Sequence, residues 1–167
     1  ENQWDSLVCG SSRTRIAGMS RESYPELPAM PQALAELPVS VLSALISRTI
    51  FAISTEESRF SLNGALLIVK ERGLAMVSTD GHRLAYVETQ QELSGIRSPH
   101  RALIPRKAMG EILKLAQESA SDATLSFASD ENHLFFQFGE RLVISRKLTG
   151  NFPDFERVLP KEHPHSV

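Results

Sequence analysis

The sequence has 167 residues, which is enough for one well-packed core but short for two. Its composition, 41% hydrophobic and 23% charged, is ordinary for a globular protein, and no stretch approaches the roughly 20 apolar residues of a membrane span. A net charge of −2 argues against tight, static binding of DNA by charge alone, because such binding needs several uncompensated Lys and Arg side chains.

The first 29 residues are expected to form a hairpin followed by an extended connector. Two short strands, at 6–9 and 14–19, flank a turn at 10–12. This segment has too few apolar residues to fold alone, and the sequence opens with neither an initiator Met nor a signal segment, so we expect a piece of a longer chain. The only cysteine, Cys9, can form neither an internal disulfide nor a zinc site by itself, which fits a reducing cytoplasm.

An amphipathic helix is predicted from Val39 to Ile53, after a short strand that closes at Leu37-Pro38. Its apolar residues recur at helical spacing, which indicates one buried face. Three strand-like runs follow, at Arg59–Leu62, Ala65–Lys70 and Leu74–Thr79. Turn residues separate these runs, so an antiparallel meander is expected.

The same order of elements then repeats. A strand at Arg83–Glu88 and a polar loop precede a second helix, from Arg106 to about Ser119. The other strands are expected at Arg101–Ile104, Ala123–Phe127, Leu134–Phe138 and Arg141–Lys147. Ile104-Pro105 before the second helix echoes Leu37-Pro38 before the first, and proline suits a first helical turn. The pattern predicts an α+β fold with two helices packed on antiparallel sheets, built from an internally duplicated β-α-β-β-β unit.

The segment Thr79–Arg83 is the best local candidate for chemistry, because Asp80 and His82 have the residue types of an acid/base pair. We favour a tight turn instead, in which Asp80 accepts hydrogen bonds from backbone amides and Gly81 has a positive φ. The sequence has no glycine-rich phosphate loop and no nucleophile elbow. We therefore expect no catalytic residue, no metal and no cofactor, and we expect the histidines at 163 and 165 to be solvated.

Two further groups of residues have a structural and a functional interpretation. Four phenylalanines, at 127, 135, 136 and 138, resemble base-stacking aromatics, but alternation along two strands predicts core positions. The outward helix faces are small, hydroxylic or mildly basic, and solvated surfaces explain them adequately. The functional alternative is a smooth surface along which DNA slides, with contacts to phosphates and none to bases.

Four motifs, in order, resemble the bacterial sliding clamp, the β subunit of DNA polymerase III. They are Ser58–Gly64, Ser78–Ala85, Ile104–Lys107 and Gly150–Phe155 with Val158–Lys161. The resemblance implies the DNA clamp (processivity) fold, with 30–160 as the central of three domains, 1–29 as the last strands of the preceding domain, and 161–167 as a linker to an absent third domain.

In that family, a homodimeric ring encircles duplex DNA without reading its sequence, has no catalytic activity, and tethers the replicative polymerase, the clamp loader and repair proteins. The resemblance therefore implies a cytoplasmic, nucleoid-associated protein with no membrane contact. Because the family's dimer contact joins the first and third domains, we expect this chain alone to be a monomer.

The resemblance also implies two binding surfaces. A pocket for short linear peptide motifs, present here only in part, would be lined by Leu62, Thr79, Gly81, His82, Arg83, Leu84, Pro153, Arg157 and Val158. DNA contacts would fall on Arg59, Phe60, Arg106 and Lys107, with Arg48 added from the face of the first helix. Two alternatives stay open: a peptide-binding module that acts without DNA, and an enzyme that uses Asp80 and His82.

Overall fold

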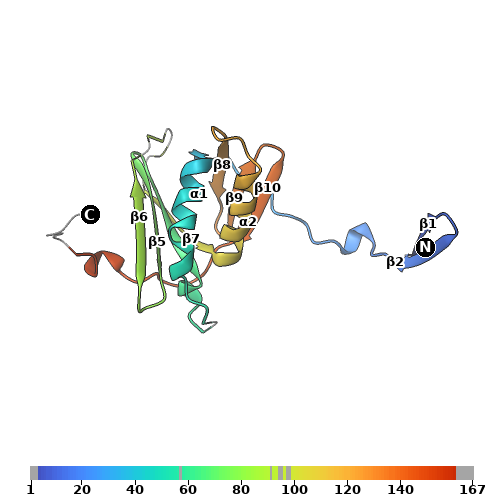
Figure 1. Cartoon of the computed structure of the whole chain (residues 1–167), viewed down its shortest axis with the longest axis horizontal. Helices are drawn as coiled ribbons and strands as arrows, with labels where there is room; N and C mark the ends of the chain where they lie inside the picture. The colour runs from blue at the N-terminus through green and yellow to red at the C-terminus, as the bar shows by residue number, and fades with distance from the viewer. Residues whose placement is uncertain (1–3, 57, 91, 94–95, 97–98, 161–167) are drawn as a thin grey trace.

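Two four-stranded antiparallel sheets with two helices between them form the main body, and a separate hairpin lies beyond an extended connector (Figure 1). The computed structural model describes residues 4–56, 58–90, 92–93, 96 and 99–160. The tail at 161–167, including the predicted linker and its two histidines, lies outside the described residues. No helix in the described part of the chain is long and apolar enough to cross a membrane.

The two sheets are built by an exchange of strands between the two halves of the main body. The first sheet has the order β6-β5-β4-β7, with β4 (Gly64–Lys70), β5 (Gly73–Thr79), β6 (Leu84–Thr89) and β7 (His100–Pro105). The second has the order β10-β9-β8-β3, with β3 (Ala35–Pro38), β8 (Thr124–Ser129), β9 (His133–Phe138) and β10 (Arg141–Arg146). Each sheet takes three strands from one half and an edge strand from the other, so the predicted duplicated unit is confirmed.

The helices α1 (Val39–Ser47) and α2 (Arg106–Gln117) start in equivalent ways. Pro38 and Pro105 stand immediately before the first helical residue, as predicted, with φ of −60° and −61°. The first amide of each helix donates to a carbonyl of the other half: Val39 N–H to Ala123 O at 2.9 Å, and Arg106 N–H to Asn63 O at 3.1 Å. These bonds satisfy amides that a helix leaves unpaired at its start.

The first helix is shorter than predicted. It ends at Ser47, and a 3₁₀ turn at Ile50–Ala52 follows, so the predicted end at Ile53 was wrong. The cause is Thr49, whose buried hydroxyl donates to Leu45 O at 2.8 Å. This local bond competes with continuation of the regular helix.

The predicted strand at Arg59–Leu62 was also wrong, because Phe60–Leu62 forms a 3₁₀ turn. Leu62 N–H donates to Arg59 O at 2.9 Å and Asn63 N–H to Phe60 O at 3.3 Å, which are the i to i+3 bonds of such a turn. Residues 59–62 alternate polar and apolar side chains in sequence, as a strand would, but Phe60 is exposed and Leu62 is buried, whereas the two would share one face of a strand.

The main core fills the space between the helices and the inner faces of both sheets. It contains Phe127, Phe136 and Phe138, and Phe135 on the opposite side of β9 is also fully buried, so the predicted core phenylalanines are confirmed. The outer face of the first sheet has its own apolar cluster, formed with residues 148–159 of the C-terminal segment. Because both faces of this sheet are covered, β4 and β5 are buried almost throughout.

The N-terminal hairpin has the predicted form, with β1 (Trp4–Cys9) paired to β2 (Ser12–Ala17). All twelve strand residues are exposed, including Trp4 and Leu7. A lone two-stranded hairpin is marginal in water. Its assignment to a preceding domain remains a prediction.

Candidate functional site

The turn between β5 and β6 is held rigidly by the side chains of Thr79 and Asp80. Thr79 Oγ1 donates to Arg83 O at 2.7 Å and accepts from Gly81 N–H at 3.0 Å. Asp80 Oδ1 accepts from the amides of His82 and Arg83 at 2.9 and 3.0 Å. Gly81 has φ of +91°, a conformation that favours glycine. The tight-turn interpretation is therefore confirmed.

The carboxylate of Asp80 is committed to this turn. Backbone hydrogen bonds from Arg83 and His82 lower the pKa of Asp80 from its ordinary value of 3.8 to about 2, and the Arg83 guanidinium adds to the effect. A carboxylate with so low a pKa is a poor general base near neutral pH. Its hydrogen bond to His82 is to the backbone amide. An acid/base pair would join the carboxylate to the imidazole ring, so this bond also weakens the enzyme alternative.

Two arginines join the turn to neighbouring segments. Arg83 Nε donates to Asp80 Oδ2 at 3.1 Å, and Arg83 Nη2 donates to Phe51 O at 2.8 Å, with the guanidinium 5.8 Å from the Phe51 ring. From the other side, Arg59 Nη1 donates to Asp80 O at 3.1 Å and its Nε pairs with Glu56 at 2.9 Å. The turn is thus tied at two points to the segment between α1 and β4.

The turn and the C-terminal segment enclose a hollow of about 410 Å³, named here the turn pocket. Its residues are Thr79, Gly81, His82, Arg83, Leu84, Pro153, Asp154, Phe155 and Val158. Phe155 anchors the C-terminal side: it is 4% exposed and stacks on Tyr86 with ring centres 5.8 Å apart. Val158 is 68% exposed, so an apolar surface remains open to a ligand.

Most of the predicted docking residues come together in the turn pocket, and Leu62 and Arg157 do not line it. Sequence reasoning missed Asp154 and Phe155, although both stand in the motif that carried the resemblance. Their contribution depends on how the C-terminal segment turns at the short 3₁₀ helix Phe155–Arg157.

Leu62 lies in a neighbouring hollow of about 450 Å³. Its residues are Ser58, Arg59, Phe60, Ser61, Leu62, Thr149, Gly150 and Pro153. Pro153 belongs to both hollows, so the two adjoin. Arg59 and Phe60, which were predicted to contact DNA, therefore share a surface with a residue predicted to contact peptide.

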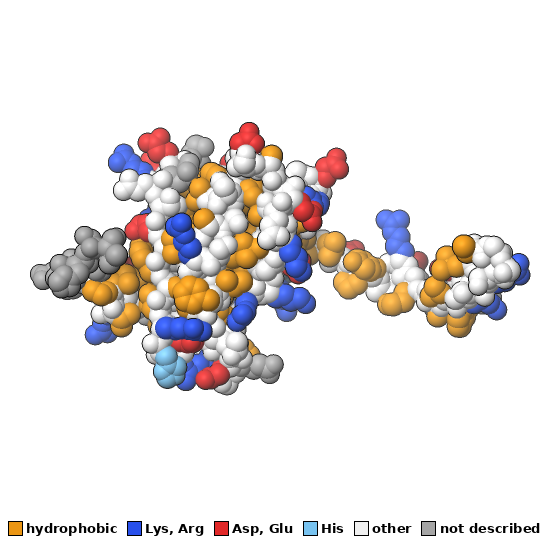
Figure 2. Space-filling view, in the orientation of Figure 1, with side chains coloured by type: hydrophobic (Ala, Val, Ile, Leu, Met, Phe, Trp, Pro, Cys, Tyr) orange, Lys and Arg blue, Asp and Glu red, His pale blue; other side chains and the backbone are white. Residues whose placement is uncertain are grey.

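The remaining predicted DNA residues lie at the ends of the two helices. Arg106 and Lys107 start α2, Arg48 follows α1, and all three are exposed. None of the three takes part in an ion pair within the described residues. Figure 2 shows Lys and Arg side chains spread singly over the face that carries α1 and α2. The described residues contain no group of three or more His, Cys, Asp or Glu that could hold a metal.

Comparisons with known proteins identify the family. Residues 36–154 match the family model of the DNA polymerase III beta subunit, central domain. The beta sliding clamp of Chlamydia muridarum is 36% identical over 154 residues, covering 92% of this chain and 41% of that protein. The clamp of Synechococcus elongatus is 30% identical over 162 residues, covering 96% and 43%.

Solved structures agree with the sequence comparison. The DNA polymerase III subunit beta of Pseudomonas aeruginosa superposes with a TM-score of 0.84 at 32% identity, covering 97% of this chain and 44% of that one. The DNA polymerase sliding clamp of Bacillus subtilis superposes with a TM-score of 0.83 at 28% sequence identity. The chain spans less than half the length of each of these proteins. The fold and the matched segment together show that this chain belongs to the family of the DNA polymerase III beta subunit, central domain.

Proposed function

We propose that this chain is the central part of a sliding clamp, a processivity factor with no catalytic activity of its own. In this proposal the turn pocket docks short linear motifs of the replicative polymerase, the clamp loader and repair proteins. The face of α1 and α2 lines the path of duplex DNA and touches phosphates without reading bases. The complete clamp, a cytoplasmic homodimeric ring, would need the parts of its relatives that lie outside this chain.

The observation that carries the docking role is the convergence of two distant segments on one apolar hollow. Leu84 comes from the start of β6 and Val158 from the C-terminal segment, yet both line the turn pocket. An apolar peptide anchor would bury itself against them, and the polar groups of Thr79 and His82 would orient the peptide backbone. A small number of such anchor residues usually provides most of the affinity of a peptide interface.

The DNA role rests on the exposed cations at the helix ends. Arg48, Arg106 and Lys107 lie on or beside the two helices and are free of ion pairs within the described segments. A few exposed cations on a chain of net charge −2 favour weak, salt-sensitive contacts. Weak contacts suit sliding, since a protein that moves along DNA must release each phosphate quickly.

A peptide-binding module that acts without DNA is the second candidate. The thin spread of basic residues over the helix face favours it, because such a face is also typical of a solvated surface (Figure 2). The two candidates differ in what Arg106 and Lys107 do. Replacing both by Gln in a full-length clamp weakens retention on circular DNA if the clamp proposal is right, and changes nothing if the module acts alone.

The docking proposal is tested with a fluorescent peptide that begins with Gln and ends in Leu-Phe. We expect saturable binding to this chain with a Kd of about 100 μM, weak because part of the pocket is missing. Binding should be lost in a variant with His82→Ala and Leu84→Ala, and kept in Leu142→Ala, an exposed apolar control on β10. Failure of both this chain and a full-length clamp to bind would refute the docking proposal.

A further inference from the structure

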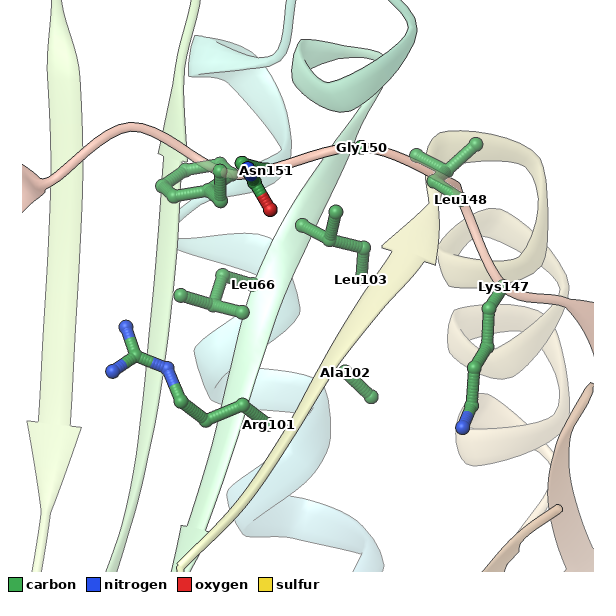
Figure 3. Close-up of a pocket in the computed structure, with 9 residues that line it drawn as sticks. Leu66, Arg101, Ala102, Leu103, Lys147, Leu148, Gly150 and Asn151 are labelled. Atoms are coloured by element: carbon green, nitrogen blue, oxygen red, sulfur yellow. The ribbon is translucent and has the colours of Figure 1, made fainter. Parts of the chain in front are cut away.

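A third hollow, of about 390 Å³, lies on the outer side of the first sheet, along β7. Figure 3 shows its arrangement: Leu66 and Leu103 form the floor, Ala102 lines it beside Leu103, Arg101 stands on one side, Lys147 and Leu148 on the other, and Gly150 and Asn151 cross above. We name it the β7-edge groove. It lies outside the turn pocket, and none of its residues lines that pocket.

One wall of this groove is the open backbone edge of a strand. β7 is the last strand of its sheet and pairs only with β4. Leu103 O accepts from Leu148 N–H at 3.4 Å, so the polar groups of Leu103 point away from β4. In an antiparallel strand both backbone groups of a residue point the same way, and every second residue repeats that direction. The amide of Leu103 and both backbone groups of Arg101 therefore face this edge.

These backbone groups are available for pairing. Apart from the bond between Leu148 and Leu103, no backbone hydrogen bond within the described residues reaches this edge of β7. Leu148 then leads into Gly150, whose φ of +102° turns the chain across the groove. The edge is thus occupied at one end and open toward Arg101. An open strand edge is a template for an added strand.

The charge of the groove is positive. Arg101 is exposed, with its guanidinium 6.0 Å from the Phe155 ring, and Lys147 Nζ donates to the backbone carbonyl of Asp130 at 2.6 Å. Neither cation forms an ion pair with any carboxylate of the described residues. Arg retains five donors in a fork that fits a carboxylate. A ligand with an acidic side chain complements this pair of cations.

We propose that the β7-edge groove is a second docking site, independent of the turn pocket, whose occupant is an extended acidic segment of a partner protein. The segment adds a strand to the open edge of β7 at Arg101 and Leu103. Its acidic side chain pairs with Arg101 or Lys147, and its apolar side chains lie on Leu66 and Leu103. Main-chain bonds give such a complex its affinity, and the flanking cations select the sequence.

The test is a selection from a random octapeptide display library. The library is depleted on a variant with Arg101→Gln and Lys147→Gln, and then selected on the unchanged 167-residue chain. We expect recovered peptides to be rich in Asp or Glu between β-branched residues. A synthetic peptide from this pool should lose at least tenfold in affinity for the double variant. If no peptide separates the two proteins, the proposal is wrong.

Three controls distinguish docking from general attraction to positive charge. Arg101→Lys keeps the charge and should retain most of the binding, and Lys114→Gln, which removes a cation from α2, should bind as the unchanged chain does. Leu84→Asp should leave this peptide's binding intact, which separates the groove from the turn pocket. Hydrogen exchange of the Leu103 amide should slow when peptide is bound. The added-strand model would be overturned if Lys114→Gln lost as much peptide affinity as the Arg101→Gln, Lys147→Gln variant. It would also be overturned if the exchange rate of the Leu103 amide did not change on peptide binding.

Discussion

At Gly64 the backbones of the two halves of the main body lie close together, and adding a single methyl group there should be costly. Gly64 starts β4 and is paired with Pro105, at the end of β7. A Cβ at this position would overlap the Ile104 carbonyl oxygen and lie 2.8 Å from the Ile104 carbonyl carbon and 2.6 Å from Leu148 Cδ1. Leu148 can move, but the backbone of Ile104 cannot move without opening the sheet.

The size of the effect follows from the shift that is needed. Carbon atoms in contact normally lie about 3.5 to 4.0 Å apart, so β4 and β7 would have to separate by about 1 Å at this end. The bond from Arg106 N–H to Asn63 O, now 3.1 Å long, would then be lost. Overpacking costs about 1 to 3 kcal/mol and a lost hydrogen bond about 1 kcal/mol. Gly64→Ala should therefore lower the free energy of unfolding by about 3 kcal/mol.

Urea denaturation followed by circular dichroism measures this change, with Gly110→Ala as the matched control. Gly110 lies inside α2, and a Cβ there meets nothing within 4 Å. Its replacement should raise the free energy of unfolding by up to about 1 kcal/mol through helix propensity. In thermal scans, Gly64→Ala should lower the melting temperature by about 6 to 12 °C. If the free energy of unfolding of Gly64→Ala lay within about 0.5 kcal/mol of that of the unchanged chain, the backbones of β4 and β7 would not lie as close at Gly64 as described.

Three further predictions concern the candidate surfaces. Leu84→Asp should weaken binding of the Gln-led peptide at least tenfold, about 1.4 kcal/mol or more, by placing a charge in the turn pocket. Replacing Arg106 and Lys107 together by Gln should weaken low-salt binding to any DNA duplex equally and reduce the slope of log K against log salt by about 2. Because the pKa of Asp80 is lowered from 3.8 to about 2, its contribution to stability should be complete above pH 4 and vanish as the pH falls through 2, as urea denaturation at each pH would show, with NMR titration giving the pKa itself.

Each of these predictions has a contrary outcome. Unchanged peptide affinity in Leu84→Asp would remove Leu84 from the docking surface. An unaltered salt slope in the double variant would mean that DNA does not touch the start of α2. For Asp80, the comparison is Asp80→Asn, whose stability should depend less on pH between 4 and 2 than that of the unchanged chain. A carboxyl group that titrates near 3.8 would contradict the bonding of the turn.

The sequence predicted the elements of the main body well, for identifiable reasons. Strands such as β5 and β9 carry dense apolar runs between turn residues, and each helix follows a proline. The errors fall where two structures satisfy the same pattern. Ile50 and Ile53 keep helical spacing after the helix has ended, and the polar/apolar order of residues 59–62 resembles a strand although it falls in a 3₁₀ turn.

The candidate site was predicted through motif resemblance more than through pattern. Thr79 to Leu84 form one contiguous motif, so their grouping required no knowledge of the fold. The burial of Phe155 against the outer face of the first sheet, and the adjacency of the two hollows at Pro153, depend on how the C-terminal segment crosses the sheet. The open edge of β7 depends on strand exchange between distant segments. Such long-range pairings have no local signal in a single sequence.

The exchange of edge strands between the two halves has a consequence for folding. β3 completes the sheet of the second half and β7 completes that of the first, so neither half can bury its core alone. A chain emerging from the ribosome with only its first half would leave one side of β4 without its partner strand. The main body must therefore fold as one cooperative unit. For the same reason, each half expressed alone should stay unfolded, and the two halves should fold only when they are mixed.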